Sequence, residues 1–320
     1  MKGGTIKSTG GLSDSDADKL GRRLRKSMNG IGTDERVIIE ILTKNGCEDR
    51  ETIADRYKKQ FGRDLKDDLK AELGGNFESA VLALCEQNSH HYLAQWCRKA
   101  IRGLGTDENT LIEIICGCKR DMVAQVDAAY KYQFRRSLEE DIESEMSGDV
   151  KRLMVALLQD GRENDDVGVS PQRSKDLAQE LYEAGEGMNS GTDEETFIRI
   201  FCTTNYPQLK KTFEEYTKFA DNSIENAIEK EFSGDLKEAL LTVVLCVKDQ
   251  NAYFAKVLHD AMKGAGTDDD TLIRILVTRS EIDLEDIKEA FKKAYKKTLA
   301  EAVTAETSGD YQKILLAIIK

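Results

Sequence analysis

Apolar residues recur three and four positions apart along most of the chain, which is the spacing of one face of an α-helix. Segment 33–42, TDERVIIEIL, shows this spacing, as do the later segments TDENTLIEII, TDEETFIRIF and TDDDTLIRIL. Each opens on Thr-Asp, residue types that cap helix N-termini. Before the first segment, Ser13 can cap a helix, and after it we expect helices over about 52–60 and 65–73 and from Gly75 onward. The pattern predicts short amphipathic helices in groups of five.

This grouping occurs four times, as two linked motifs show. The glycine of each Gly-Thr-Asp triplet is followed, 40 positions later, by a glutamate that opens the pentad Glu-x-[Ser/Gly]-Gly-[Asp/Asn]. The Asp or Asn that ends each pentad is expected to cap the fifth helix. The glycine–glutamate pairs are Gly32 with Glu72, Gly105 with Glu145, Gly191 with Glu231, and Gly266 with Glu306.

The motifs and the composition together predict an all-α fold. The chain has 320 residues and only two prolines, and its β-branched runs are short. We expect four homologous five-helix repeats, an N-terminal tail and one polar linker between the second and third repeats. The expected boundaries are 1–12 for the tail, 13–87, 88–160, 173–248 and 249–320 for the repeats, and 161–172 for the linker.

The glycine turns and the distant glutamates together suggest a cation site. Glycine allows backbone conformations that turn carbonyl oxygens inward, and a carboxylate can close such a ring. A site with oxygen ligands alone suits a hard cation, and we expect Ca²⁺. The expected ligands are the carbonyls of Met28, Gly30 and Gly32 with Glu72, those of Ile101, Gly103 and Gly105 with Glu145, and those of Met262, Gly264 and Gly266 with Glu306.

The third turn departs from this pattern. Asn189 stands where the other turns have their middle glycine, and Asn tolerates a positive φ better than most residues. We therefore expect Gly187 and Gly191 with Glu231 to form the third site. The alternative for any one turn is a helix C-cap glycine followed by an N-cap. That alternative does not explain a glutamate at a fixed distance in all four repeats.

The expected ligands do not fill the coordination sphere of calcium, which takes six to eight oxygens. A phosphate or carboxylate group from a partner could complete it. The formal charge of −12 argues against nucleic acid as that partner. It would also repel anionic lipid, a conflict that a bridging divalent cation would remove.

Other sequence features narrow the class of protein. We expect the seven cysteines to be mostly buried free thiols of a cytoplasmic protein. No segment approaches 18 apolar residues, so we expect no transmembrane helix. No nucleophile elbow or phosphate-cradling loop is present, which predicts a protein that is not an enzyme.

The turns MNGIGTD, IRGLGTD and MKGAGTD and the pentads ELGGN, EMSGD, EFSGD and ETSGD resemble those of an annexin core, throughout the chain beyond the tail. The resemblance implies a slightly curved disc with calcium loops on one face and reversible, calcium-dependent binding to acidic phospholipid membranes. It implies a peripheral membrane protein whose tail could bind a protein partner. Lateral self-association on a membrane would fit a disc-shaped molecule. An additional extracellular location of the protein stays open. By the same resemblance, the residue after each triplet is expected to help bind secondary ions: Glu35, Glu108, Glu194 and Asp269.

Two other functions stay open. One is a calcium-permeable channel, which the resemblance suggests through a central polar channel lined by charged residues. Here Leu93 and Trp96 fall where acids would lie and Cys118 replaces a basic residue, although Arg274 is kept. The other is a helical scaffold for protein partners with vestigial calcium sites.

Overall fold

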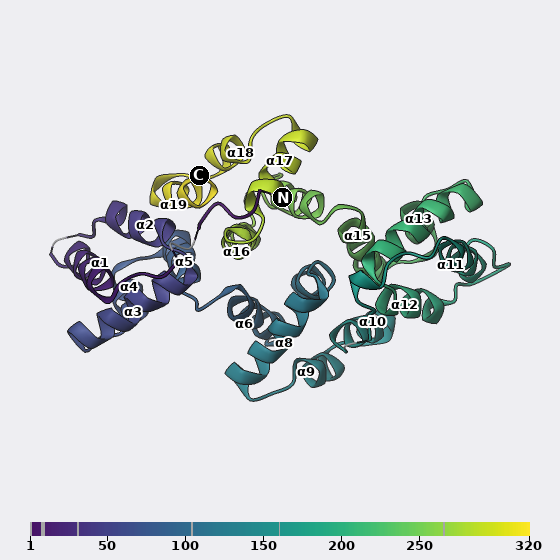
Figure 1. The fold of residues 1–320 in the computed structure, drawn as a ribbon, viewed down its shortest axis with the longest axis horizontal. Coiled ribbons are helices and arrows are strands. Elements are labelled where there is room, and N and C mark those ends of the chain that lie inside the picture. Colours follow the sequence, from purple (N-terminus) through teal and green to yellow (C-terminus); the bar gives the residue numbers. More distant parts are fainter. Residues whose placement is uncertain (1, 8–9, 31, 104, 160, 265) are drawn as a thin grey trace. The chain divides into compact units, whose positions relative to one another are not determined.

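The computed structural model describes residues 2–7, 10–30, 32–103, 105–159, 161–264 and 266–320. Within these residues the chain forms helices and no strand, which confirms the all-α prediction (Figure 1). The chain divides into two compact units. One contains residues 1–92 and 254–320, and the other contains residues 93–253.

The helices follow the predicted order of five per repeat. The first repeat contains α1 (Asp14–Ser27), α2 (Glu35–Lys44), α3 (Cys47–Phe61), α4 (Leu65–Glu72) and α5 (Gly75–Leu84). The second contains α6 (Ser89–Ile101), α7 (Glu108–Leu111) with a π-helical turn at Ile112–Cys116, α8 (Arg120–Phe134), α9 (Leu138–Glu145) and α10 (Gly148–Leu158).

The third repeat follows a 3₁₀ turn at Asp165–Val167. It contains α11 (Pro171–Ala184), α12 (Glu194–Thr203), α13 (Tyr206–Ala220), α14 (Ile224–Glu231) and the first part of α15 (Gly234–Ala261). Asp249 interrupts α15 with extended backbone, so two helices meet there end to end. The second part of α15 begins the fourth repeat, which continues with α16 (Asp269–Arg279), α17 (Leu284–Tyr295), α18 (Leu299–Glu306) and α19 (Gly309–Ile319).

Helix starts agree with the sequence pattern in part. The Ser13 hydroxyl accepts the Asp16 amide at the start of α1, and Asp34 caps α2. The expected caps of the fifth helices were wrong. The N-caps of α5, α10 and α19 are Gly74, Ser147 and Ser308, and the Asn or Asp of each pentad lies inside the helix. The cause is the pentad glycine, which is the first residue of the helix in all four repeats. Its φ is positive, at 60–68°, in Gly75, Gly148, Gly234 and Gly309.

The helix expected over 52–60 begins earlier, at Cys47, because a distant carboxylate caps it. Its N-cap is Gly46, which has no side chain to accept the first amides. Both Glu281 carboxylate oxygens lie 3.0 Å from the Cys47 amide nitrogen. The same carboxylate pairs with Arg50 at 2.8 Å, and the Arg50 side chain is only 6% exposed. A residue of the fourth repeat thus completes a helix of the first.

Part of the tail is fixed against the fourth repeat. The amides of Lys2 and Gly3 donate to the Asp286 carboxylate at the start of α17. The Thr5 hydroxyl donates to the Ile318 carbonyl at 2.6 Å, and Ile6 is buried. Residues 2–6 therefore pack against the beginning of α17 and the end of α19.

The linker is also held by hydrogen bonds. The Glu163 amide donates to the Thr203 carbonyl, and the Asp165 carboxylate accepts the Tyr206 amide at the start of α13. Pro171 is the first residue of α11, so the helix begins inside the expected linker range. Asp160, the expected last residue of the second repeat, lies outside the described residues.

The seven cysteines are free thiols, as expected. Five of them are buried: Cys97, Cys116, Cys118, Cys202 and Cys246.

Candidate metal site

The same backbone hydrogen bond closes each glycine loop. In the first repeat the Asp34 amide donates to the Ser27 carbonyl at 2.9 Å. The corresponding bonds run from Asp107 to Ala100, from Asp193 to Ala184 and from Asp268 to Ala261, at 2.8–2.9 Å. The four loops therefore have a common base, at which the first helix of a repeat ends and the second begins.

The third loop is two residues longer than the others, as the positions of its closing bond show. Asn189 corresponds to the middle glycines when the loop is counted back from Gly191, but not when it is counted forward from Ala184. It is also absent from the described residues with positive φ, so the expected special conformation of this Asn was wrong. Gly191 does have a positive φ, of 78°, and Gly187 does not.

The glycines of the other three loops adopt the backbone conformation that their residue type allows. Gly30 and Gly32 have φ values of 131° and 87°, and Gly103, Gly105, Gly264 and Gly266 are also positive. The residues that begin these loops, Met28, Ile101 and Met262, are buried and anchor them, whereas the glycines are exposed. Ile31, Leu104 and Ala265 lie outside the described residues.

A buried polar cluster connects the first loop to the helix that carries Glu72. The Asp68 carboxylate accepts hydrogen bonds from Arg25 at 2.9 Å, from the Tyr57 hydroxyl at 2.6 Å and from Arg63 at 2.7 Å. Arg25 lies in the last turn of α1, directly before the loop, and Asp68 lies on α4 one turn before Glu72. The cluster thereby fixes the helix of the acid relative to the helix of the loop.

The second repeat contains the same cluster 73 positions later. Asp141 accepts hydrogen bonds from Arg98 at 2.8 Å, from the Tyr130 hydroxyl and from Arg136. Sequence reasoning missed both clusters. The signal was present, because the four residues of the cluster recur with the same 73-residue spacing as the first two glycine loops.

The third and fourth repeats replace this cluster by other contacts. Ala227 and Ala302 stand where the first two repeats have aspartate. In the third repeat, Glu186 of the loop accepts the Tyr216 hydroxyl at 2.9 Å and the Asn222 amide at 3.0 Å. In the fourth repeat, an aromatic stack of His259 on Tyr295, with 3.8 Å between ring centroids, joins the helix before the loop to α17.

Acid should destabilise the protein through Asp68 and Asp141. Hydrogen bonds from Arg63 and Arg136, respectively, are the main reason that the pKa of each carboxyl is lowered. A pKa below the unfolded value of about 3.9 stabilises the fold at higher pH, and this contribution is lost as pH falls through the folded pKa. We expect the urea midpoint, followed by circular dichroism, to fall below about pH 4. An Asp141→Asn variant should show a shallower fall, and equal slopes in the two proteins would contradict this origin.

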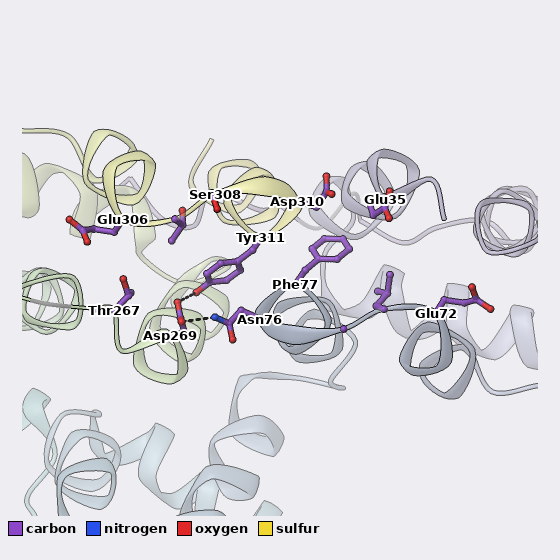
Figure 2. Close-up of a pocket in the computed structure, with 14 residues that line it drawn as sticks. Glu35, Glu72, Asn76, Phe77, Thr267, Asp269, Glu306, Ser308, Asp310 and Tyr311 are labelled. Atoms are coloured by element: carbon purple, nitrogen blue, oxygen red, sulfur yellow. Dashed lines mark hydrogen bonds between the residues drawn. The ribbon is translucent and has the colours of Figure 1, made fainter. Parts of the chain in front are cut away.

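The structure brings acid and loop together in the third and fourth repeats. The Glu231 carboxylate lies 3.4 Å from the hydroxyl of Thr192, the residue after Gly191, and its side chain is 17% exposed. Lys230 pairs with the same carboxylate at 3.2 Å. In the fourth repeat, Glu306 lines one pocket of about 690 Å³ together with Gly266 and Thr267 (Figure 2).

The other predicted acids lie at the ends of the equivalent helices. Glu72 lines the same pocket as Glu306, whereas Gly32 lines a separate pocket of about 520 Å³. Glu145 is exposed at the end of α9. Among the described residues, no three His, Cys, Asp or Glu side chains cluster closely enough to hold a metal ion. A cation here would therefore need backbone carbonyl oxygens as well as a carboxylate.

Comparisons with known proteins agree with the four-repeat fold. The annexin family model matches residues 21–84, 92–157, 176–243 and 253–318. Human annexin A13 is 45% identical over 309 residues, which cover 95% of each chain. The structure of chicken annexin V matches with a TM-score of 0.91 and 42% identity over 99% of this chain and 98% of that one. The structure of calcium-bound annexin (Sm)1 matches with a TM-score of 0.84 and 34% identity, over 99% of this chain and 92% of that one.

Proposed function

Because this chain belongs to the annexin family, we propose that it binds acidic phospholipid membranes reversibly when calcium occupies its glycine loops. The observation that carries this proposal is the contact between Glu231 and Thr192. This contact supports the pairing of a carboxylate with the glycine loop whose Gly191 precedes it by 40 positions. The calcium-bound state of a related structure, annexin (Sm)1, supports the choice of cation.

The proposed ligands explain why lipid and calcium would depend on one another. Each loop offers neutral carbonyl oxygens and one carboxylate, fewer oxygens than calcium takes. A lipid phosphate can occupy the open positions, so each ion would bind more tightly at a membrane than in solution. Four ions would add about +8 to a chain of formal charge −12 and so reverse its repulsion from anionic lipid near the loops.

The proposed attachment is peripheral, and the proposed activity is binding and not catalysis. None of the described helices combines the length and the apolar character needed to span a bilayer. A protein partner at the tail would have to displace the contacts of residues 2–6 with the fourth repeat or bind beside them. Lateral association of bound molecules would add avidity without changing any single site.

A vesicle co-sedimentation assay tests this function. We expect the protein to pellet with phosphatidylserine-containing vesicles in calcium and to return to the supernatant when chelator is added. Magnesium should not replace calcium, because it demands a tighter octahedral geometry and keeps its waters. Vesicles of phosphatidylcholine alone are the control for lipid charge. Sedimentation that is unchanged by chelator would contradict the proposal.

A further inference from the structure

The pocket that contains Glu72 and Glu306 is lined by matching residues of the first and fourth repeats (Figure 2). Twelve of its residues form six pairs that occupy the same position in the two repeats. These pairs are Glu35 with Asp269, Glu72 with Glu306, Leu73 with Thr307, Gly74 with Ser308, Asn76 with Asp310, and Phe77 with Tyr311. The lining residues of the first repeat can therefore be compared with those of the fourth repeat position by position.

Asp269, Asn76 and Tyr311 are among the pocket residues that differ from every counterpart in the other repeats. Asp269 replaces the glutamate found at Glu35, Glu108 and Glu194. Asn76 replaces the aspartate found at Asp149, Asp235 and Asp310. Tyr311 replaces residues without a hydroxyl, namely Phe77, Val150 and Leu236.

These three residues form one hydrogen-bonded cluster. The Asn76 amide donates to one carboxylate oxygen of Asp269, and the Tyr311 hydroxyl donates to the other at 2.8 Å (Figure 2). The residue types at positions 76 and 311 are needed for this arrangement. An aspartate at position 76 would face the carboxylate with a like charge, and a phenylalanine at position 311 would offer no donor.

The surroundings of two of the three counterparts of Asn76 support this explanation. Asp149 and Asp310 are paired with cations three residues later on their own helices, Arg152 and Lys313, each at 2.9 Å. The residue three positions after Asn76 is Ser79, which carries no charge. Asn76 therefore has no cation at this distance on its own helix, and it bonds to a residue of the fourth repeat.

The cluster joins the parts from which two of the proposed calcium sites are built. Asp269 begins α16, two residues after Thr267 of the fourth glycine loop. Asn76 lies near the start of α5 and ends the pentad that Glu72 opens. Tyr311 follows the pentad that Glu306 opens. The Asp269 carboxylate thus connects the fourth glycine loop to the two pentads that Glu72 and Glu306 open.

We propose that the Asn76–Asp269–Tyr311 cluster couples the calcium sites of the first and fourth repeats, with Asp269 as a positioning residue. This inference rests on the proposed function. An ion at Glu72 would order the pentad that ends at Asn76, and Asn76 would in turn hold Asp269 and the adjoining loop. The fourth site would then bind its ion at a smaller ordering cost, and the coupling would be reciprocal. Both Asp269 oxygens accept hydrogen bonds in this arrangement, and the positioning role stands beside the secondary-ion role expected for this residue.

The coupling can be measured by a double-mutant cycle. Glu72→Gln, Glu306→Gln and the double variant are compared by isothermal calcium titration in the presence of phosphatidylserine vesicles. In the native sequence, we expect Glu72→Gln to weaken the remaining fourth-repeat site about fivefold or more, so that the two changes are not additive. In an Asn76→Ala background we expect additivity. Asp149→Ala, the same position in the second repeat, is the matched control and should leave the coupling unchanged.

A reversed pair separates coupling from a general loss of structure. Asn76→Asp alone places two carboxylates together and should abolish the coupling. When it is combined with Asp269→Asn, donor and acceptor exchange places, and the new Asn can still accept the Tyr311 hydroxyl. We expect this pair to restore non-additivity. Thermal unfolding without calcium checks that each variant is folded.

The outcomes distinguish this inference from the proposed function. Additive effects in the native background, or coupling that persists in Asn76→Ala, would overturn the inference and leave membrane binding intact. A native protein that does not bind vesicles in calcium would instead overturn the function on which the inference rests.

Discussion

Replacing Glu72, Glu145 and Glu306 together by glutamine is expected to raise the calcium concentration for half-maximal vesicle binding more than about tenfold. Each substitution keeps the side-chain shape and removes the one anionic ligand proposed for its loop. A neutral amide oxygen is a much weaker partner for a divalent cation than a carboxylate. Calcium titration of vesicle co-sedimentation measures the shift. The third site keeps Glu231 and should leave residual binding.

The matched control is Glu143→Gln with Glu229→Gln. These exposed glutamates lie on α9 and α14 two residues before the proposed ligands of those helices. Replacing them changes the net charge almost as much as the triple substitution does but removes no proposed ligand. We therefore expect the calcium concentration for half-maximal vesicle binding to shift by less than about twofold, because surface charges are screened by salt. If the control and the triple variant shifted equally, net charge would explain the binding and the ligand assignment would be wrong.

Asp141→Asn is expected to destabilise the protein by about 3 kcal/mol, because breaking a buried ion pair leaves charge without its partner. The Asp141 side chain is only 2% exposed and lies against the guanidinium groups of Arg98 and Arg136. Asparagine has the same shape but would turn a donor toward one of these groups. Urea unfolding followed by circular dichroism measures the change. Calcium affinity should also fall, since the cluster fixes α9 relative to the second loop.

Asp149→Asn provides the comparison for that result. Asp149 pairs with Arg152 on the surface, where both side chains are more than a third exposed. Such a pair contributes about 0.5 kcal/mol or less. Similar losses in the two variants would show that the cluster around Asp141 has no special role in stability.

Much of the fold could be predicted from the sequence because its signals are local. Helical spacing of apolar residues, the cap at Ser13 and the triplets before each second helix all lie within a few residues of what they determine. Repetition then turned weak local signals into a strong one. The expected ligand carbonyls lie in loops with a common closing bond, for the same reason.

The features that could not be predicted from the sequence depend on residues far apart in the chain. The start of α3 is set by Glu281, a residue 234 positions away from Cys47. The length of the third loop became clear only from its closing bond, because counting back from Gly191 cannot reveal an insertion. Asn76 and Tyr311 stood in the sequence as departures from the repeat, but their common partner is visible only in space.

The division into two units has a consequence for synthesis. Residues 93–253 are continuous, so the ribosome releases everything that this unit needs well before the end of the chain. The other unit consists of the first and last parts of the sequence, and its opening repeat must wait for Glu281 and Asp269 to emerge. The part made first is therefore the part whose contacts are completed later.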